Sequence, residues 1–541
     1  MAVPQPALPS PSATKPGTSD MESGRSTHSI NPATNEVIAS FPATDTRALP
    51  EIFRRARDAQ KDWEETPVRE RCEMLRLLRD AIFARRHEIA SVLTRETGKP
   101  LAEAIFSEIL LALDTANFLA RRAPRWLRPH RVPHHNIALK AKSGILKYEP
   151  HGIVAVISPW NYPFAIPMLQ VIAASVAGNA VILKPSELTP WTGALVGELC
   201  GRSRFPEGLV QVVQGGGELG AALIEAGPDK VCFTGSLAVG RGVAEACARK
   251  LIPSLLELGG NDAMLVLGGE DLDTASSAAV WGSFMNCGQA CLSVERIYVA
   301  ERLAEEFTRR CVEKTKKLRL GPPSDAGAEI GPMIRERQIE RVESQLRDAV
   351  ERGAQILTGG KRRPALGPNF FEPTVVGRVD HSMQLMREET FGPVLAVCTV
   401  KSTDEAVALA NDSPFALSAS VWTRNLRVAR EVAARLRAGS VMINDVASYY
   451  GICEAPHGGR GESGWGRTHS RLGLLELVQP KYVDVDRLPR LRKPWWFGYG
   501  EGLAESADRF VELLFARDWR ARRRALMDPR LRALFSTRGK L

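Results

Sequence analysis

One cysteine, Cys291, ends a short segment in which glycine and amide side chains could expose a thiol to a cleft. The segment, residues 284–291, reads Phe-Met-Asn-Cys-Gly-Gln-Ala-Cys. Gly288 allows a sharp backbone bend, and a thiol reacts as a nucleophile when its pKa is lowered and its approach is open. Taken alone, the segment is better explained by a buried structural cysteine, because free cysteines are mostly small hydrophobic residues. Whether Cys291 is a nucleophile or a structural cysteine depends on the other segments of the chain.

Two other polar side chains follow short apolar runs that are typical of strands. Glu257 precedes Gly259 and Gly260, so we expect a partly buried carboxylate beside mobile backbone, and burial makes a carboxylate a better general base. A core carboxylate paired with an arginine is the alternative. Asn161 follows a run at residues 153–157 and would place an amide donor at the same sheet edge, either for a developing oxyanion or as a turn cap.

Two more segments have the composition of phosphate or ribose sites. Residues 231–236 and Gly240 form a glycine turn between an apolar run and a helical stretch, and helix N-termini bind phosphate. The spacing differs from the usual dinucleotide fingerprint, so on its own it favours a simple turn. Residues 184–187, Lys-Pro-Ser-Glu, directly follow another apolar run, where sheet ligands bind, although a solvated loop has the same composition.

Taken together and in order, these segments resemble the aldehyde dehydrogenase superfamily over roughly residues 30–485. The motifs that carry the resemblance are Phe284-x-Asn286-x-Gly288-Gln289-x-Cys291, Leu256-Glu257-Leu258-Gly259-Gly260, Pro159-Trp160-Asn161, Lys184-Pro185-Ser186-Glu187 and Glu388-Glu389-Thr390-Phe391-Gly392-Pro393. Order and spacing make the match specific where each motif alone is weak.

The resemblance implies oxidation of an aldehyde to a carboxylic acid with NAD(P)+ and water, without metal. Cys291 would form a thiohemiacetal and then a thioester, and Glu257 would activate water to cleave it. Asn161 and the Cys291 backbone N–H would stabilise the oxyanion. Relatives that transfer the acyl group to coenzyme A usually lack this glutamate, so Glu257 disfavours the acylating alternative. The retained reacting residues also disfavour a non-catalytic scaffold.

The resemblance also implies a nicotinamide cofactor site. Its implied members are Ile157, Pro159, Trp160, Lys184, Ser186, Glu187, Gly235, Ser236, Gly240, Leu258, Gly259, Glu389 and Phe391. A carboxylate at Glu187 favours ribose hydroxyls over a 2′-phosphate, so NAD is expected, and Lys184 leaves NADP open. Glu389 and Phe391 match the positions that hold the nicotinamide ribose and ring.

The sequence departs from the family pattern at two places near these motifs. Asn261-Asp262 stand where the family often has Lys, and His457 stands where Phe is usual. Neither change removes a reacting group. The loop at residues 446–452, Val-Ala-Ser-Tyr-Tyr-Gly-Ile, matches the family's substrate funnel and contains no arginine to hold a second carboxylate. We therefore expect an apolar or aromatic aldehyde rather than succinate semialdehyde.

Hydrophobic periodicity predicts the elements that position these residues. Helical spacing predicts amphipathic helices at residues 47–63, 68–97 and 101–122. After residue 148, short apolar runs alternate with helical stretches in two successive series, a pattern typical of parallel sheets. The expected fold class is α/β and aldehyde-dehydrogenase-like, with a Rossmann-type cofactor domain, an α/β catalytic domain and small bridging strands.

The expected domains follow from this alternation and from the resemblance. They are residues 29–136 and 151–260 for the NAD(P)-binding domain, 261–471 for the catalytic domain, 137–150 and 472–485 for oligomerisation strands, and 486–541 for a basic amphipathic C-terminal extension. The bridging strands imply a homodimer or homotetramer. Residues 1–28, rich in Pro, Ser, Ala and Thr, are expected to be disordered, with Met21 as an alternative start.

Composition bounds the cellular setting and the partners. The 541 residues contain no apolar run long enough to span a membrane, and nine scattered cysteines favour a reducing cytoplasm over a disulfide framework or a zinc site. The net charge is +10, and residues 486–541 carry fourteen basic and seven acidic residues, a balance of +7. The body is therefore near neutral, and nucleic-acid binding is not expected.

The C-terminal extension combines an apolar helical face with basic flanks. Residues 503–515 place apolar side chains on one side of a helical pattern, and five arginines with Trp519 follow at residues 517–524. Such a helix can lie in a membrane surface, where each arginine near anionic lipid adds about 1 kcal/mol. Packing on the body or on a partner subunit is the more frequent use of such a face. A peripheral membrane contact is thus the second expectation for this segment.

Overall fold

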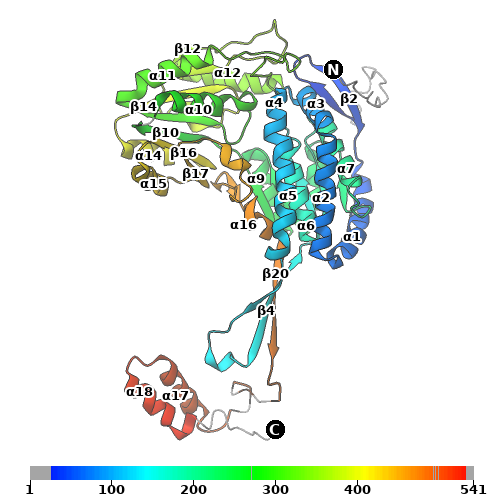
Figure 1. Ribbon diagram of the computed structural model, residues 1–541, viewed down its shortest axis with the longest axis vertical. Helices are drawn as coiled ribbons and strands as arrows, with labels where there is room; N and C mark the ends of the chain where they lie inside the picture. Colours follow the sequence, from blue (N-terminus) through cyan, green and yellow to red (C-terminus); the bar gives the residue numbers. More distant parts are fainter. Residues whose placement is uncertain (1–25, 270, 491–492, 494, 498, 532–541) are drawn as a thin grey trace. The chain divides into compact units, whose positions relative to one another are not determined.

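The computed structural model describes residues 26–269, 271–490, 493, 495–497 and 499–531 (Figure 1). Of the segment expected to be disordered, residues 1–25 lie outside the described residues. Residues 26–28 instead begin strand β1 (Ser26–Asn31), which pairs antiparallel with β2 (Glu36–Pro42). The chain divides into two compact units: residues 26–128 with 148–479, and residues 129–147 with 480–531.

The first unit begins with a helical layer. Its helices are α1 (Leu49–Glu65), α2 (Val68–Ala84), α3 (Arg86–Thr97), α4 (Leu101–Ala104) and α5 (Leu110–Trp126). α2 buries Leu75, Leu78 and Ile82 at three- and four-residue spacing, as the periodicity predicts. The helix predicted at 68–97 is two helices that meet at Arg85, and the one predicted at 101–122 contains a π-helical segment, Ile105–Ile109.

A six-stranded sheet in the order β19-β9-β8-β5-β6-β7 follows. Its parallel strands are β5 (Ile153–Ile157), β6 (Ala180–Lys184), β7 (Val210–Val212), β8 (Lys230–Thr234) and β9 (Ser254–Glu257), and β19 (Gly464–Trp465) pairs antiparallel with β9. The connecting helices are α6 (Ala165–Ala177), α7 (Pro190–Gly201), α8 (Gly217–Glu225) and α9 (Leu237–Arg249). Because the strands are parallel, their carboxyl ends bring Ile157, Lys184, Thr234 and Glu257 to one edge.

A second sheet has seven strands in the order β12-β13-β14-β11-β10-β16-β17. The strands are β10 (Asp262–Gly268), β11 (Val294–Ala300), β12 (Gln355–Thr358), β13 (Thr374–Gly377), β14 (Val394–Val400), β16 (Ser418–Thr423) and β17 (Ser440–Ile443); all pairings are parallel except that of β12. Its helices are α10 (Leu272–Phe284), α11 (Glu301–Thr315), α12 (Glu336–Glu351), α13 (Gln384–Arg387), α14 (Thr403–Asn411) and α15 (Leu426–Arg435) (Figure 1). The expected α/β class is confirmed.

Each sheet has its own hydrophobic core, and a small third cluster lies beside Cys291. That cluster buries Leu292, Leu417, Ala447 and Tyr449. Short pairs of strands, including β15 (Phe415–Ala416) with β18 (Arg460–Gly461), and helix α16 (Ser470–Leu475) complete the unit. The site residues therefore lie on loops fixed by rigid cores, which is the usual way that catalytic groups are held.

The second unit contains a three-stranded sheet in the order β20-β4-β3 and two helices. The elements are β3 (His130–Val132), β4 (Lys142–Pro150), β20 (Val478–Asp486), α17 (Leu503–Phe515) and α18 (Trp519–Met527). Of the ranges predicted as strands, residues 137–139 form a 3-10 turn and 470–475 form α16. Within the described ranges, no helix has the length and hydropathy of a membrane-spanning segment.

Candidate active site

The turn that carries Cys291 has an unusual backbone. After α10 ends at Phe284, Asn286, Cys287 and Gly288 adopt φ angles of 51°, 57° and 72°, three left-handed residues in succession. At Gly288 a Cβ would lie 2.1 Å from the carbonyl oxygen of Gly392, so only glycine fits. The two non-glycine residues each cost about 1–2 kcal/mol in this conformation. The turn therefore needs support from its surroundings.

Hydrogen bonds from several elements supply that support. The side-chain amide of Asn286 donates to the carbonyl oxygens of Asn161 (2.9 Å) and Gln289 (3.1 Å), and its backbone N–H donates to Glu103 (3.0 Å). Gln289 Oε1 accepts the Ile334 N–H at 2.9 Å. The amides beside the cysteine thus hold the turn rather than the substrate.

A buried ion pair fixes the segment that contains Asn161. Lys99 and Glu108 pair with both side chains fully buried, and Lys99 Nζ donates to the Asn161 carbonyl oxygen at 2.9 Å. Glu108 also accepts the backbone N–H groups of Phe164 (2.8 Å) and Ala165 (2.9 Å) at the start of α6. Removing one member of such a pair costs about 3–5 kcal/mol. Sequence reasoning missed it, because single charged residues within helical stretches give no signal of burial.

Asn161 and Cys291 lie at the same end of this network. Asn161 is buried, and its amide nitrogen donates one of its two hydrogens to the Gln289 carbonyl oxygen at 3.1 Å, which leaves the second available. Burial raises the pKa of the half-buried Cys291 thiol above its ordinary value, and the carboxylates of Asp262, Glu389 and Glu257 raise it further. The backbone N–H of Cys291 has the opposite effect on this pKa. In this environment the neutral thiol is favoured.

Glu257 and Cys291 line one cavity. Glu257 ends β9 with 5% of its surface exposed, and within the described part of the chain neither carboxylate oxygen has a hydrogen-bond partner. The same cavity is lined by Tyr450 and His457, and His457 Nε2 lies 3.3 Å from Glu257 Oε2. The carboxylate is thus buried as predicted, and its near neighbour is a histidine rather than a core arginine. Among the described residues, the Glu257 carboxylate oxygens are thus left able to accept hydrogen bonds.

The start of α9 forms a cradle for an anion. Gly235 and Ser236 precede the helix, and the Ser236 side chain makes no capping hydrogen bond, so the first N–H groups remain available. A Cβ at Gly240 would lie 2.3 Å from the Leu258 side chain, and one at Gly235 would lie 2.6 Å from Phe233. The glycines therefore let α9 approach the ends of β8 and β9 closely.

Residues at the end of β6 offer a carboxylate at the same edge of the sheet. Lys184 is buried, which lowers the pKa of its ammonium group, and its Nζ lies 3.4 Å from Glu187 Oε2 and donates to the Pro185 carbonyl oxygen at 3.2 Å. The Glu187 side chain is about half exposed (48%). Ser186 is buried and accepts the Leu188 N–H at 3.3 Å. Glu187 is the group here that can receive hydroxyl donors.

The Glu389–Phe391 segment meets the loop after β5. The Trp160 and Phe391 rings contact edge to face, with centroids 5.4 Å apart, next to Pro159. Glu389 accepts the Gly260 N–H at 3.1 Å, and a Cβ on Gly259 would lie 2.8 Å from the Glu389 carboxylate.

A second carboxylate, Glu295, holds that segment and was missed from the sequence. It accepts the N–H groups of Thr390 (2.8 Å) and Phe391 (2.9 Å), and Phe391 has a φ of 54°. Burial and the charge of Glu389 together raise the pKa of Glu295 to about 8. Burial raises the pKa of Glu389 to about 7. A charged residue inside the apolar run of β11 was the available signal.

These features fit a dinucleotide cofactor. Unused N–H groups at a helix N-terminus with a glycine-lined approach can hold phosphates, and a half-exposed carboxylate at the same sheet edge can accept ribose hydroxyls. Ile157, Lys184, Thr234 and Glu257 end the parallel strands at that edge.

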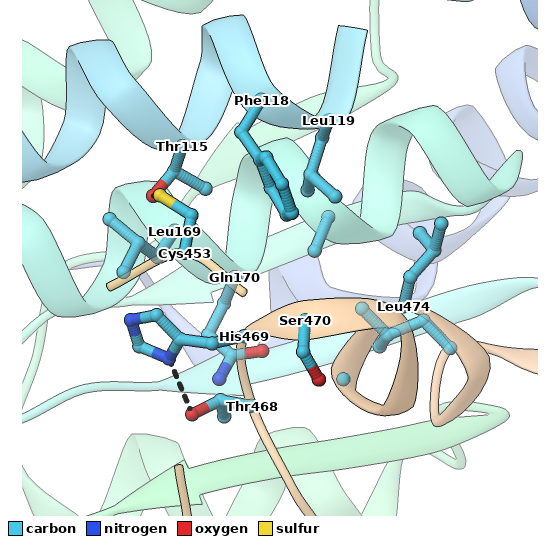
Figure 2. Close-up of a pocket in the computed structure, with 13 residues that line it drawn as sticks. Thr115, Phe118, Leu119, Leu169, Gln170, Cys453, Thr468, His469, Ser470 and Leu474 are labelled. Carbon is cyan, nitrogen blue, oxygen red and sulfur yellow. Dashed lines mark hydrogen bonds between the residues drawn. The ribbon is translucent and has the colours of Figure 1, made fainter. Parts of the chain in front are cut away.

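A second cavity adjoins the one at Cys291. Figure 2 shows it between Phe118 and Leu119 of α5, Leu169 of α6 and Leu474 of α16. The two cavities share Leu169, Gln170, Thr468 and His469 in their linings.

The linings of both cavities carry little charge. Burial lowers the pKa of His469 to about 3, with the neighbouring His457 adding to the shift, so this imidazole is neutral. Among the described residues, neither lining contains a lysine or an arginine. In the loop expected to form the substrate funnel, Tyr449 is buried and Tyr450 faces the cavity.

Comparisons with known proteins agree with this geometry. The sequence model of the Aldehyde dehydrogenase family matches residues 19–483. The chain is 39% identical to a Methylomonas sp protein named 4,4'-diapolycopene aldehyde oxidase, covering 90% of this chain and 91% of the relative. It is 38% identical to a Mycobacterium ulcerans protein provisionally named NADP(+) succinate-semialdehyde dehydrogenase 2, covering 85% and 89%. The crystal structure of a Sinorhizobium meliloti NAD-dependent aldehyde dehydrogenase superposes with a TM-score of 0.83 at 35% identity, covering 88% and 94%.

Proposed function

Because the chain belongs to the aldehyde dehydrogenase family and is an NAD(P)-dependent enzyme that oxidises aldehydes, we propose that Cys291 is its nucleophile and Glu257 its general base. Asn161 is the side-chain donor to the oxyanion. The observation that carries this assignment is the single cavity lined by Cys291 and by a buried Glu257 carboxylate with unused acceptor capacity. A carboxylate so placed can activate water next to the thioester.

The proposed reaction uses these residues in sequence. The Cys291 thiol gives its proton to solvent water as Sγ bonds to the aldehyde carbon. The negative charge on the oxygen is stabilised by the second Asn161 amide hydrogen and the Cys291 backbone N–H, about 3 kcal/mol for one donor. Bound NAD(P)+ supplies the hydride acceptor. Glu257 then takes a proton from water as the water oxygen bonds to the thioester carbon, the carbon–sulfur bond breaks to release the acid, and the Cys291 thiolate takes the proton back from Glu257.

We further propose that NAD is the preferred cofactor. Glu187 is half exposed at the same sheet edge as the anion cradle, and a carboxylate accepts ribose hydroxyls but repels a 2′-phosphate. The buried Lys184 already contacts Glu187 and a backbone carbonyl. The names of relatives point both ways, since one is NAD-dependent and another is named for NADP(+).

The substrate that fits the cavities best is an apolar or aromatic aldehyde. The second cavity, which adjoins the one at Cys291, is lined by Phe118, Leu119, Leu169 and Leu474, and the neutral His469 adds no charge. The Methylomonas relative is named for an aldehyde whose parent, diapolycopene, is a hydrocarbon. Succinate semialdehyde, named for the mycobacterial relative, carries a carboxylate that would need a cation in the lining.

An aldehyde panel tests both preferences in one assay. We expect kcat/KM for hexanal or benzaldehyde to exceed that for succinate semialdehyde by at least about tenfold, because an unpaired carboxylate in an apolar lining costs well over 1.4 kcal/mol. We also expect NAD+ to give a higher kcat/KM than NADP+. The absorbance of the reduced nicotinamide measures each rate. A higher value for the semialdehyde contradicts the substrate proposal, and acceleration by coenzyme A would favour the acylating alternative.

We propose that residues 29–136 with 151–260 act as the cofactor domain, 261–471 as the catalytic domain, and 137–150 with 472–485 as the surface through which a homodimer or homotetramer forms. The support is that β4 and β20 lie in a separate small sheet whose β20 side chains are largely exposed. Nine free cysteines support a reducing compartment. Light scattering of the purified protein measures the assembly.

The C-terminal helices support a peripheral contact with an anionic lipid surface. Trp495, Trp496, Phe515 and Trp519 are between 49% and 72% exposed. Arginines 517, 520 and 522–524 lie in or next to α18. Exposed aromatic side chains beside a basic cluster are the composition that binds anionic membranes. Such a contact suits an enzyme whose aldehyde partitions into lipid.

Co-sedimentation with phosphatidylserine vesicles tests this contact. Changing Arg522, Arg523 and Arg524 to Glu should lower the partition coefficient by at least about 100-fold, since each arginine contributes about 1 kcal/mol. Binding of the unchanged protein should weaken as the salt concentration rises. The matched control changes Arg424, Arg427 and Arg430, exposed residues at α15, to Glu for the same net charge. Equal, salt-insensitive recovery of all three proteins would contradict the membrane contact.

A further inference from the structure

His457 occupies a position where the sequence departs from the family pattern, and its ring is closely confined. Its backbone forms a two-way bridge with Thr468, through bonds of 3.0 and 2.8 Å. The imidazole meets the ring of Tyr450 edge to face at 4.7 Å and lies 5.9 Å from the ring of His469. Only 4% of the residue is exposed. The ring is therefore held in one orientation by its neighbours.

The two ring nitrogens of His457 face different partners. Nδ1 lies 2.9 Å from the Tyr449 hydroxyl oxygen, and Nε2 lies 3.3 Å from Glu257 Oε2. Burial raises the pKa of Tyr449 well above its ordinary value, so the phenol keeps its proton and can donate it to Nδ1. The side chain of Ser440 also hydrogen bonds the phenol, and a serine hydroxyl can be the donor there.

This arrangement decides the tautomer of the imidazole. When Nδ1 accepts from Tyr449, the ring hydrogen of a neutral histidine lies on Nε2, on the side of Glu257. The opposite tautomer would direct a nitrogen lone pair at the carboxylate, which is repulsive. Tyr449 thus donates to His457, and His457 faces Glu257, the carboxylate proposed as the general base, with its Nε2–H.

We propose that His457 is a positioning residue for Glu257, an inference that rests on the proposed function of that carboxylate. The Nε2–H, fixed by Tyr449, supplies a hydrogen bond to a buried carboxylate that otherwise has none within the described residues, and holds it toward the cavity shared with Cys291. The 3.3 Å separation is within hydrogen-bond range, so rotation of the Glu257 carboxylate alone would align the bond without movement of the backbone. Its effect falls on thioester hydrolysis, the step in which Glu257 accepts the water proton.

The decisive variant is His457→Phe, which keeps an aromatic ring and removes the donor. We expect its steady-state rate to fall about tenfold or more, as is usual when the partner that orients a catalytic group is removed, while the first turnover of nicotinamide reduction stays within about twofold. Hydrolysis then becomes the slow step, so the acyl thioester should accumulate on the protein. Intact-protein mass spectrometry after an acid quench, with hexanal and NAD+, measures the acylated fraction.

Three further variants separate positioning from structural support. His457→Gln retains an amide donor and should restore part of the rate, and Tyr449→Phe should reduce the rate in the same direction but by less. The matched control is His381→Phe, because His381 also lies between a tyrosine hydroxyl (Tyr298, 2.9 Å) and a carboxylate (Asp412, 3.1 Å) but in the loop between β13 and α13, outside the cavity. His381→Phe should change neither the steady-state rate nor the acylated fraction.

The outcomes distinguish this inference from the function on which it rests. Equal slowing of the first turnover and the steady state in His457→Phe, or no gain in acyl-enzyme, overturns the role of His457. If His457→Phe does not fold, Tyr449→Phe decides by the same two readouts. Failure of the unchanged protein to reduce NAD+ with any aldehyde would instead contradict the proposed function.

Discussion

Replacing Cys291 by alanine should abolish aldehyde oxidation and leave the cofactor bound. The loss should be at least about 10⁴-fold in kcat, because no other group in the described cavity can form the thioester. The anion cradle at α9 and the Glu187 carboxylate lie on other loops than Cys291, so the NAD+ affinity should change by less than about threefold. Stopped-flow absorbance measures the chemistry, and titration calorimetry measures the binding.

The control for this change is Cys287→Ala, four residues earlier. Cys287 is buried and does not line the cavity that Cys291 shares with Glu257, so it should not react with the aldehyde. We expect Cys287→Ala to keep activity within about threefold. Full activity in Cys291→Ala, or loss of activity in both variants alike, would show that another residue is the nucleophile.

Replacing Glu257 by glutamine should stop the reaction after one turnover. An amide in place of this carboxylate cannot accept a proton from water, so steady-state turnover should fall roughly 10²- to 10⁴-fold, the usual contribution of a general base. Addition of the thiol to the aldehyde does not require the carboxylate in the proposed sequence. A burst of nicotinamide absorbance of about one equivalent per active site should therefore remain, followed by almost no further change.

The surface substitution Glu462→Gln is the matched control, since Glu462 pairs with Arg241 at the protein surface and lies outside the cavity. It should behave as the unchanged protein. Loss of the burst together with turnover in Glu257→Gln would mean that Glu257 acts before the thioester forms, and the assignment of its role would then be wrong.

Much of the scaffold follows from local patterns in the sequence. The apolar run at 153–157 coincides with β5, and the runs near 180, 210, 231 and 255 mark the other parallel strands of the same sheet. Since the carboxyl ends of parallel strands share an edge, the placement of Lys184 and Glu257 at that edge was predictable from the strands alone. Cys291, Glu257 and Asn161 were predicted instead from the order of the motifs shared with the family, and their roles stay predictions.

The contacts that support the site could not be predicted in this way. Lys99 donates to the Asn161 carbonyl oxygen and Glu108 accepts the Phe164 N–H, while His457 lies 3.3 Å from Glu257. Such contacts depend on side-chain packing between distant segments, for which one sequence gives no period or spacing. The raised pKa of the Cys291 thiol is another effect of packing, because burial by surrounding side chains outweighs the opposing effect of the Cys291 backbone N–H.

The raised pKa of Cys291 has a consequence for durability. Peroxides and alkylating compounds attack thiolates far faster than thiols, so a nucleophile kept in its neutral form resists the first step of oxidative damage. A raised pKa at the proposed nucleophile should therefore slow the oxidation and alkylation of Cys291 between turnovers.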